Sequence, residues 1–133
     1  MSQNWVKDIA DMHAKYGVHE WIKNNPEKLE QLLHFRVAFL KEEFDETFKA
    51  AGEKDAEEIV DGLIDLCVVA IGTLDAFGVD AYKAWDEVHQ ANMSKEVGVK
   101  KERPNPLGLP DLVKPEGWIN PSHGGNYGLL NDI

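Results

Sequence analysis

The sequence predicts an all-α protein, a helical bundle of about four principal helices followed by an irregular C-terminal arm. Its 133 residues, 43% of them hydrophobic, have the size and apolar content of a single domain. Apolar residues recur at helical spacing up to about residue 97, whereas five of the six prolines and six of the eleven glycines come later. We therefore expect a helical domain over residues 1–97. An arm over residues 98–133 should pack on this domain or on a neighbouring subunit.

The first half of the predicted domain contains one short helix, a shorter helical piece and one long helix. Apolar residues before Gly17 recur at helical spacing, and the short second piece is expected over residues 18–23. Asn25 followed by Pro26 is typical of a helix start, because asparagine caps the free N–H groups and proline suits the first helical position. A long helix is expected from this proline to Gly52, which serves as its stop signal.

Two further helices complete the predicted domain. Asp55 is expected to cap a helix that continues to Phe77 and stops at Gly78. Asp80 is expected to cap the last helix, which reaches about Ser94. No segment predicts a strand. The helix after Asp55 is apolar on nearly all sides in its second half, so we expect the chain to assemble as a dimer or tetramer.

The charge balance limits the classes of partner. Lysine and arginine number 14 against 24 acidic residues, a formal net charge of −10, so the chain should repel nucleic acids. No apolar run approaches the roughly 20 residues that span a bilayer. Cys67 is the only cysteine, which excludes an internal disulfide and fits a reducing compartment. We therefore expect a cytoplasmic protein with no nucleic-acid or membrane partner.

Acidic residues are concentrated between positions 41 and 65, a segment that contains ten of them and only three lysines. Such a cluster is often only a solvated charged face, so its position around the helix is decisive. At about 100° per residue, Glu43 and Glu46 flank the apolar stripe of the long helix, whereas Glu42 and Asp45 point away from it. The stripe itself consists of Leu29, Leu33, Val37, Leu40, Phe44 and Phe48.

The next helix carries a second set of acids. Glu58, Asp61 and Asp65 share one side of it, and two antiparallel helices would bring Glu43, Glu46, Glu58 and Asp61 into one pocket. Four like charges there require a cation. Oxygen ligands select Mg²⁺ or Mn²⁺, whose usual further ligand is a phosphate. No histidine follows a glutamate by three residues, which disfavours a di-iron centre.

Three motifs in this order resemble those of the MazG-like all-α nucleoside triphosphate pyrophosphohydrolases. They are residues 41–46 (KEEFDE), residues 58–65 (EIVDGLID) and residues 92–95 (NMSK), and the likeness covers about residues 26–105. The long arm is more similar to small viral (phage) members, for which the host cytoplasm is expected. The resemblance implies a MazG-like fold that assembles as dimers or pairs of dimers. It also implies Mg²⁺-dependent cleavage between the α- and β-phosphates to a monophosphate and pyrophosphate.

The resemblance also implies roles for individual residues. The implied metal ligands are Glu43, Glu46, Glu58 and Asp61. Glu43 and Glu46 are also expected catalytic residues, with Glu46 or Asp65 as the base for the attacking water. The expected substrate contacts are Asn92, Lys95, Arg103 and Arg36. For the lysine, the alternative is a simple complement to the helix dipole.

Four points are not fixed by the sequence. Only 11 residues separate Glu46 from Glu58, so a register that uses Glu42 and Asp45 is the rival set of ligands. The expected substrate is a nucleoside triphosphate or its deoxy form, with (d)GTP preferred. The alternative function is a non-catalytic helical dimerisation module with a solvated acidic face. The arm either closes the site as a lid or braces a subunit interface.

Overall fold

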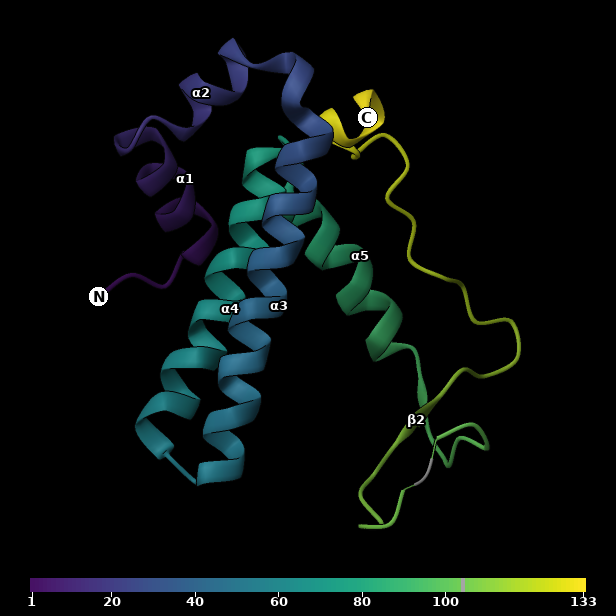
Figure 1. The fold of residues 1–133 in the computed structure, drawn as a ribbon. Coiled ribbons are helices and arrows are strands. Elements are labelled where there is room, and N and C mark those ends of the chain that lie inside the picture. Colours follow the sequence, from purple (N-terminus) through teal and green to yellow (C-terminus); the bar gives the residue numbers. More distant parts are fainter. Residues whose placement is uncertain (104) are drawn as a thin grey trace. The chain divides into compact units, whose positions relative to one another are not determined.

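Helices dominate the part of the chain that the computed structural model describes, residues 1–103 and 105–133 (Figure 1). Residue 104, within the predicted arm, lies outside the described residues. The α-helices there are α1 (Trp5–Lys15), α2 (Val18–Asn24), α3 (Leu29–Glu53), α4 (Ala56–Ala76) and α5 (Ala81–Met93). Two 3₁₀ segments, η1 (Pro26–Lys28) and η2 (Gly128–Asp132), and two strands, β1 (Glu96–Val97) and β2 (Leu112–Val113), complete the described elements.

The chain divides into two units, and the first comprises residues 1–81 and 125–133. Its centre is the antiparallel pair α3 and α4, with α1 packed along α4 (Figure 1). The buried core at one end of this pair consists of Ile22, Leu29, Ala76 and Phe77. The C-terminal segment belongs to this unit, since the Leu129 N–H donates to the carbonyl of Phe77 at 2.7 Å.

Residues 82–124 form the second unit, which contains most of α5 and the two short strands. β1 and β2 pair antiparallel, with Glu96 opposite Val113. The indole Nε1 of Trp118 donates to the carbonyl of Ala91 at 2.8 Å, which ties the returning chain to α5 within this unit. The chain is mostly helical as predicted, but the expectation that it has no strand is wrong. A strand of two residues is too short to show the alternation of polar and apolar side chains by which strands are predicted. Its pairing also depends on the path of the chain between β1 and β2.

The predicted helices are confirmed, and the short piece after Gly17 makes the fifth. Both ends of the long helix differ from the prediction: Pro26 begins a 3₁₀ turn before α3, and α3 continues through Gly52. The left-handed residue that ends it is Lys54, at φ 57°. Asp55 follows at once and caps α4 by accepting the N–H of Glu58, so this two-residue connection ends one helix and starts the next.

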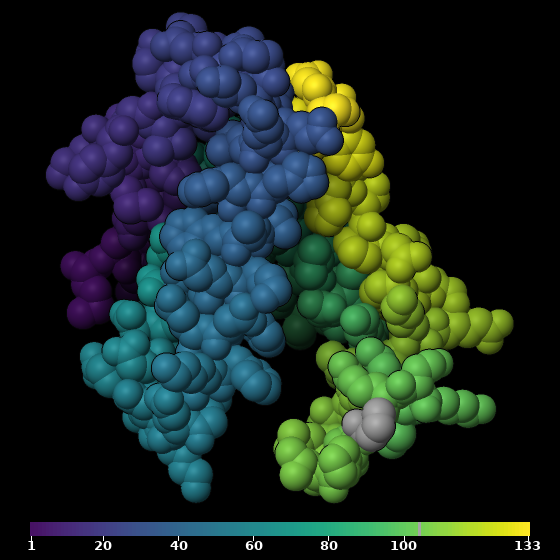
Figure 2. Space-filling view, in the orientation of Figure 1, coloured from purple at the N-terminus to yellow at the C-terminus, as the bar shows by residue number. Residues whose placement is uncertain are grey.

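The predicted apolar stripe of α3 is buried only at its beginning. Leu29 is buried, but the exposed fractions of Val37, Phe44 and Phe48 are 52%, 54% and 71%. The neighbouring side of α3, which includes Arg36 and Thr47, faces α4 instead. In Figure 2 the side chains of α3, in blue, form an open face of the first unit. Periodicity predicted this stripe as the core side of the helix, but the structure leaves much of it exposed.

Candidate functional site

The two long helices pack tightly against each other beside two of the predicted acidic residues. Gly62 of α4 faces Thr47 of α3, and a Cβ atom added at Gly62 would lie 2.2 Å from the Thr47 Oγ1 atom. The Thr47 hydroxyl donates to the carbonyl of Glu43 at 2.8 Å, which orients this side chain along its own helix. Glu46 precedes Thr47, and Asp61 precedes Gly62. The missing side chain at position 62 therefore lets acids from both helices come together.

Glu43 and Asp65 are partly buried in this cluster, whereas Glu42, Glu46 and Asp61 are exposed. Burial raises the pKa of Glu43 above the usual glutamate value, and the negative charges of Glu46, Asp65, Glu42 and Asp61 raise it further. Two of these four acids come from α3 and two from α4. The structure thus brings together most of the carboxylates that the sequence predicted. Ionised Glu43 is disfavoured there unless a cation compensates the charge.

Three of the predicted or rival acids, Asp45, Glu58 and Glu42, are exposed. Asp45 is exposed and accepts the ammonium of Lys41 at 2.7 Å, so it turns to a neighbour on its own helix. Glu58 is exposed in the first turn of α4, and it is not among the charges that raise the pKa of Glu43. Glu42 is exposed but contributes to that shift. Glu43 is thus partly buried among these charges, whereas Glu42 is exposed.

This donor set suits a hard divalent ion. Its potential ligands are carboxylate oxygens, which Mg²⁺ prefers, and the pKa of Glu43 is raised by burial and then by the neighbouring negative charges. The residues present therefore fit Mg²⁺. The individual roles of Glu43, Glu46, Glu58, Asp61 and Asp65 stay predictions.

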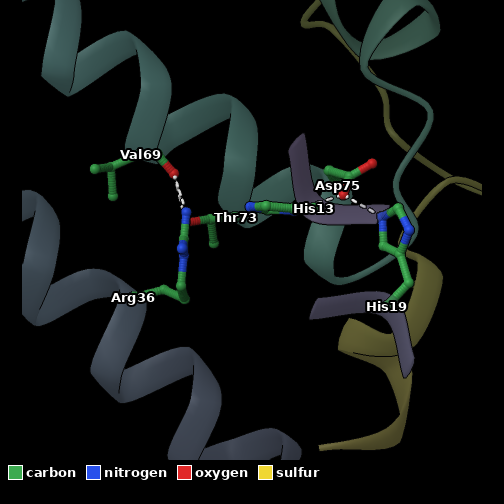
Figure 3. Close-up of polar contacts among 6 residues, drawn as sticks. All are labelled: His13, His19, Arg36, Val69, Thr73 and Asp75. Atoms are coloured by element: carbon green, nitrogen blue, oxygen red, sulfur yellow. Dashed lines mark hydrogen bonds and ion pairs between the residues drawn. The ribbon is translucent and has the colours of Figure 1, made fainter. Parts of the chain in front are cut away.

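Arg36, expected as a substrate contact, lies two turns before Glu43 and points into the contact between α3 and α4 (Figure 3). Its Nη2 atom donates to the carbonyl of Val69 at 3.0 Å, and its Nε atom donates to the hydroxyl of Thr73 at 3.1 Å. Burial lowers the pKa of Arg36, and the negative charge of Asp75 partly opposes that shift. In this arrangement the guanidinium joins the two helices.

The other expected substrate contacts belong to the second unit. Asn92 is exposed in the last turn of α5, and the Lys95 ammonium lies 5.5 Å from the centre of the Trp118 ring. Arg103 forms an ion pair with Asp111. The pKa of Asp111 is lowered, first by the hydrogen bond from the Leu112 N–H and then by Arg103. Both basic side chains thus have partners within this unit.

One polar cluster of the first unit was not anticipated from the sequence. His13, His19 and Asp75 meet where α1, α2 and α4 come together (Figure 3). The aspartate follows the histidines by more than 50 positions, so no local spacing pattern marks the group. Its presence could be recognised only from the tertiary structure.

A comparison with models of protein families identifies the family of the chain. The model described as phosphoribosyl-ATP pyrophosphohydrolase matches residues 17–92, more than half of the chain. The chain belongs to the phosphoribosyl-ATP pyrophosphohydrolase family. This match includes all the acids around Glu43 and ends at Asn92, before Lys95 and the arm.

Membership of the phosphoribosyl-ATP pyrophosphohydrolase family confirms the resemblance, since this family is part of the MazG-like all-α superfamily. The protein is thus a pyrophosphohydrolase by family, a hydrolase that acts on acid anhydrides, and the family is typically Mg²⁺-dependent. No curated protein and no solved structure matches the chain. None of the helices in the described residues combines the length and hydropathy of a membrane span.

Proposed function

We propose that this family member hydrolyses nucleoside triphosphates or deoxynucleoside triphosphates between the α- and β-phosphates, releasing a monophosphate and pyrophosphate. The observation that carries the proposal is the group of four acids around partly buried Glu43, beside the contact between Gly62 of α4 and Thr47 of α3. A solvated acidic face would not need this burial. The family match supports the reaction class, and the guanine nucleotides are our expected preferred substrates.

Different residues of the chain are proposed to bind the metal, to accept the proton and to bind the phosphates. Glu43, Glu46, Glu58 and Asp61 would hold Mg²⁺. When bound, Mg²⁺ offsets the charge of the triphosphate and lowers the pKa of a coordinated water. Glu46 or Asp65 would accept the proton of the attacking water, since both are carboxylates near Glu43. The amide of Asn92 and the cations of Lys95 and Arg103 would bind phosphate oxygens.

A substrate panel tests the reaction. The purified full chain is incubated with Mg²⁺ and each of the common ribonucleoside and deoxyribonucleoside triphosphates, and with phosphoribosyl-ATP, the substrate in the family's name. Phosphorus NMR then separates pyrophosphate from orthophosphate. Pyrophosphate with a nucleoside monophosphate, fastest from (d)GTP, is the expected result. Exclusive turnover of phosphoribosyl-ATP would keep the reaction class but replace the substrate.

Paired variants test the acids. Glu43→Gln and Asp61→Asn should each lose more activity than the roughly 10–100-fold that removal of an outer-shell partner costs a metal site. Glu42→Gln is the matched control, because this neighbouring glutamate is exposed. It should retain most of the turnover. Near-normal turnover of both pocket variants at saturating Mg²⁺ would refute the assignment. No turnover by the wild type, with no thermal response to Mg²⁺ and nucleotide, would favour the dimerisation module.

We also propose that the chain functions as a homo-oligomer, a dimer or tetramer. Large apolar side chains are exposed along both central helices: Phe35, Val37, Phe44 and Phe48 of α3, and Val60, Leu63 and Ile64 of α4. The rings of Phe44 and Phe48 lie 6.1 Å apart between centres and form one continuous apolar strip. A monomer would leave this surface in water, whereas a second copy of the same helices would cover it.

A further inference from the structure

Two histidines and one aspartate from three helices converge on a single point of the first unit (Figure 3). His13 lies on α1, His19 at the start of α2 and Asp75 near the end of α4. The Nδ1 atom of His13 and the Nε2 atom of His19 each lie 2.7 Å from the same carboxylate oxygen, Oδ2 of Asp75. All three potential ligand atoms lie within 4.8 Å of one another.

The local structure explains why the two rings meet. Gly17, between α1 and α2, has a φ of 79°, a left-handed conformation that glycine adopts without strain. The chain therefore turns between His13 and His19, and their ring centres lie 5.9 Å apart with the planes at 82°. Gly72 makes room for His13, since an added Cβ would lie 3.3 Å from the His13 Cε1 atom. Packing thus holds the His13 ring in place.

We propose that His13, His19 and Asp75 form a site for a zinc-type divalent cation. Two imidazole nitrogens and one carboxylate oxygen are donors that Zn²⁺ accepts, and three protein ligands with one open position are a common arrangement for this ion. The side chains of His13 and Asp75 are 5% and 18% exposed, whereas that of His19 is 44% exposed. The site is enclosed on the His13 side and open to water beside His19.

Only a small movement converts the hydrogen-bonded cluster into a coordination site. Around a tetrahedral Zn²⁺ with bonds of about 2.0–2.1 Å, neighbouring ligand atoms are about 3.3 Å apart. Each nitrogen therefore moves outward by roughly 0.6 Å from its present 2.7 Å separation. The exposed side chain of His19 can supply much of that movement. Each ring then binds the ion through the nitrogen that faces Asp75 and keeps its single proton on its other ring nitrogen.

The surroundings of Asp75 allow a cation to bind. Arg36 is the nearby positive group, but its guanidinium donates to the Val69 carbonyl and the Thr73 hydroxyl. The Asp75 carboxylate is therefore held by the two imidazoles. Because these are neutral when they bind a metal, the site carries a single negative charge to attract the ion.

This site is separate from the acidic cluster. Asp75 follows Asp65 by ten residues on α4, which corresponds to about 15 Å along the helix axis. The donors also differ, because imidazole favours Zn²⁺ over Mg²⁺. His13 lies outside the part of the chain that the family model matches. The inference therefore does not depend on the proposed hydrolysis, and the ion would fasten the turn between α1 and α2 to the end of α4.

Metal titrations of the full chain test this inference. After chelator treatment and dialysis, the protein is titrated with Zn²⁺ by calorimetry and with Co²⁺ by visible absorption, in excess Mg²⁺ to occupy the acidic cluster. We expect one Zn²⁺ per chain, a higher Tm with Zn²⁺, and the intense visible bands of four-coordinate Co²⁺. Absence of stoichiometric Zn²⁺ binding would overturn the proposal and leave a hydrogen-bonded cluster only.

Three variants locate the ion. His19→Gln and Asp75→Asn should abolish Zn²⁺ binding and the rise in Tm. His34→Gln is the matched control, because His34 is also a histidine near an acid, 3.9 Å from Glu30, but 78% exposed and outside the cluster. It should bind Zn²⁺ like the wild type. Unchanged binding by His19→Gln would overturn the proposal. If Asp75→Asn does not fold, His19→Gln still decides, since its side chain is partly exposed.

A fourth variant separates the two sites. Glu43→Gln should bind Zn²⁺ normally while losing Mg²⁺-dependent turnover. Loss of Zn²⁺ binding in this variant would assign the ion to the acidic cluster and would also overturn the proposal. Failure of the hydrolase assay with normal Zn²⁺ binding would instead contradict only the proposed function.

Discussion

Substitution of Gly52 in α3 and of Gly62 in α4 by alanine should change stability in opposite directions. Gly52→Ala adds a side chain where nothing lies within 4 Å, so it should gain about 1 kcal/mol from helix propensity. Gly62→Ala gains the same stability from helix propensity, but it places its Cβ atom 2.2 Å from Oγ1 and 3.2 Å from Cβ of Thr47. Threonine is stiff at χ1, so the helices must separate.

The expected magnitude follows from these two terms. Overpacking of this kind costs about 1–3 kcal/mol, which exceeds the gain in propensity. Gly62→Ala should therefore be destabilised by about 1 kcal/mol and should differ from Gly52→Ala by about 2 kcal/mol. At this chain length each kcal/mol corresponds to a change in Tm of roughly 3–5 °C. Thermal unfolding at one fixed protein concentration, with chelator present, measures the difference.

A double variant and a binding assay complete this test. Thr47→Ala removes the Oγ1 atom that Gly62→Ala would meet, so the combined variant should recover at least about 1 kcal/mol relative to additivity. Separation of the helices also moves the acids apart, so Gly62→Ala should bind Mg²⁺ more weakly, whereas Gly52→Ala should not. If Gly62→Ala is stabilised as much as Gly52→Ala, the close approach is not as described and the reasoning fails.

Two further predictions concern charge and assembly. The pKa of Glu43 is raised in the folded chain, so its protonation stabilises the fold below the ordinary glutamate pKa, and this stabilisation is lost as pH rises through the raised value. Metal-free wild type should therefore gain Tm relative to Glu43→Gln between about pH 7 and pH 4.5, and parallel curves for the two proteins would contradict this. Sedimentation at micromolar concentration should show a dimer or tetramer, held by the strip that includes Phe44 and Phe48, and a monomer would refute the assembly.

Much of the helical structure could be predicted because its signals are local. The cap at Asp55 and the stop at Gly78 act through hydrogen bonds and backbone angles within a few residues, and both ends of α4 agree with the prediction. Helical periodicity also placed Glu43 beside the apolar stripe of α3, and its charge interactions reach Asp61 and Asp65 of α4. These features depend on neighbours three or four positions apart.

Other features depend on contacts that no local pattern describes. The short pairing of β1 with β2, the exposure of Phe44 and the engagement of Arg36 with Val69 follow from which surfaces meet in the folded chain. Gly52 was expected to end α3, but the tight connection to α4 placed that end at Lys54.

The sequence by itself determined the helices, their order and the two sets of acids, because a 3.6-residue period and capping side chains act over one or two turns. Only the tertiary structure decided that Gly62 and Thr47 touch and that His13 and His19 share Asp75. These residues are separated by 6 to more than 50 positions. Their approach results from the packing of whole helices, in which every buried side chain contributes, and spacing along the chain does not encode it.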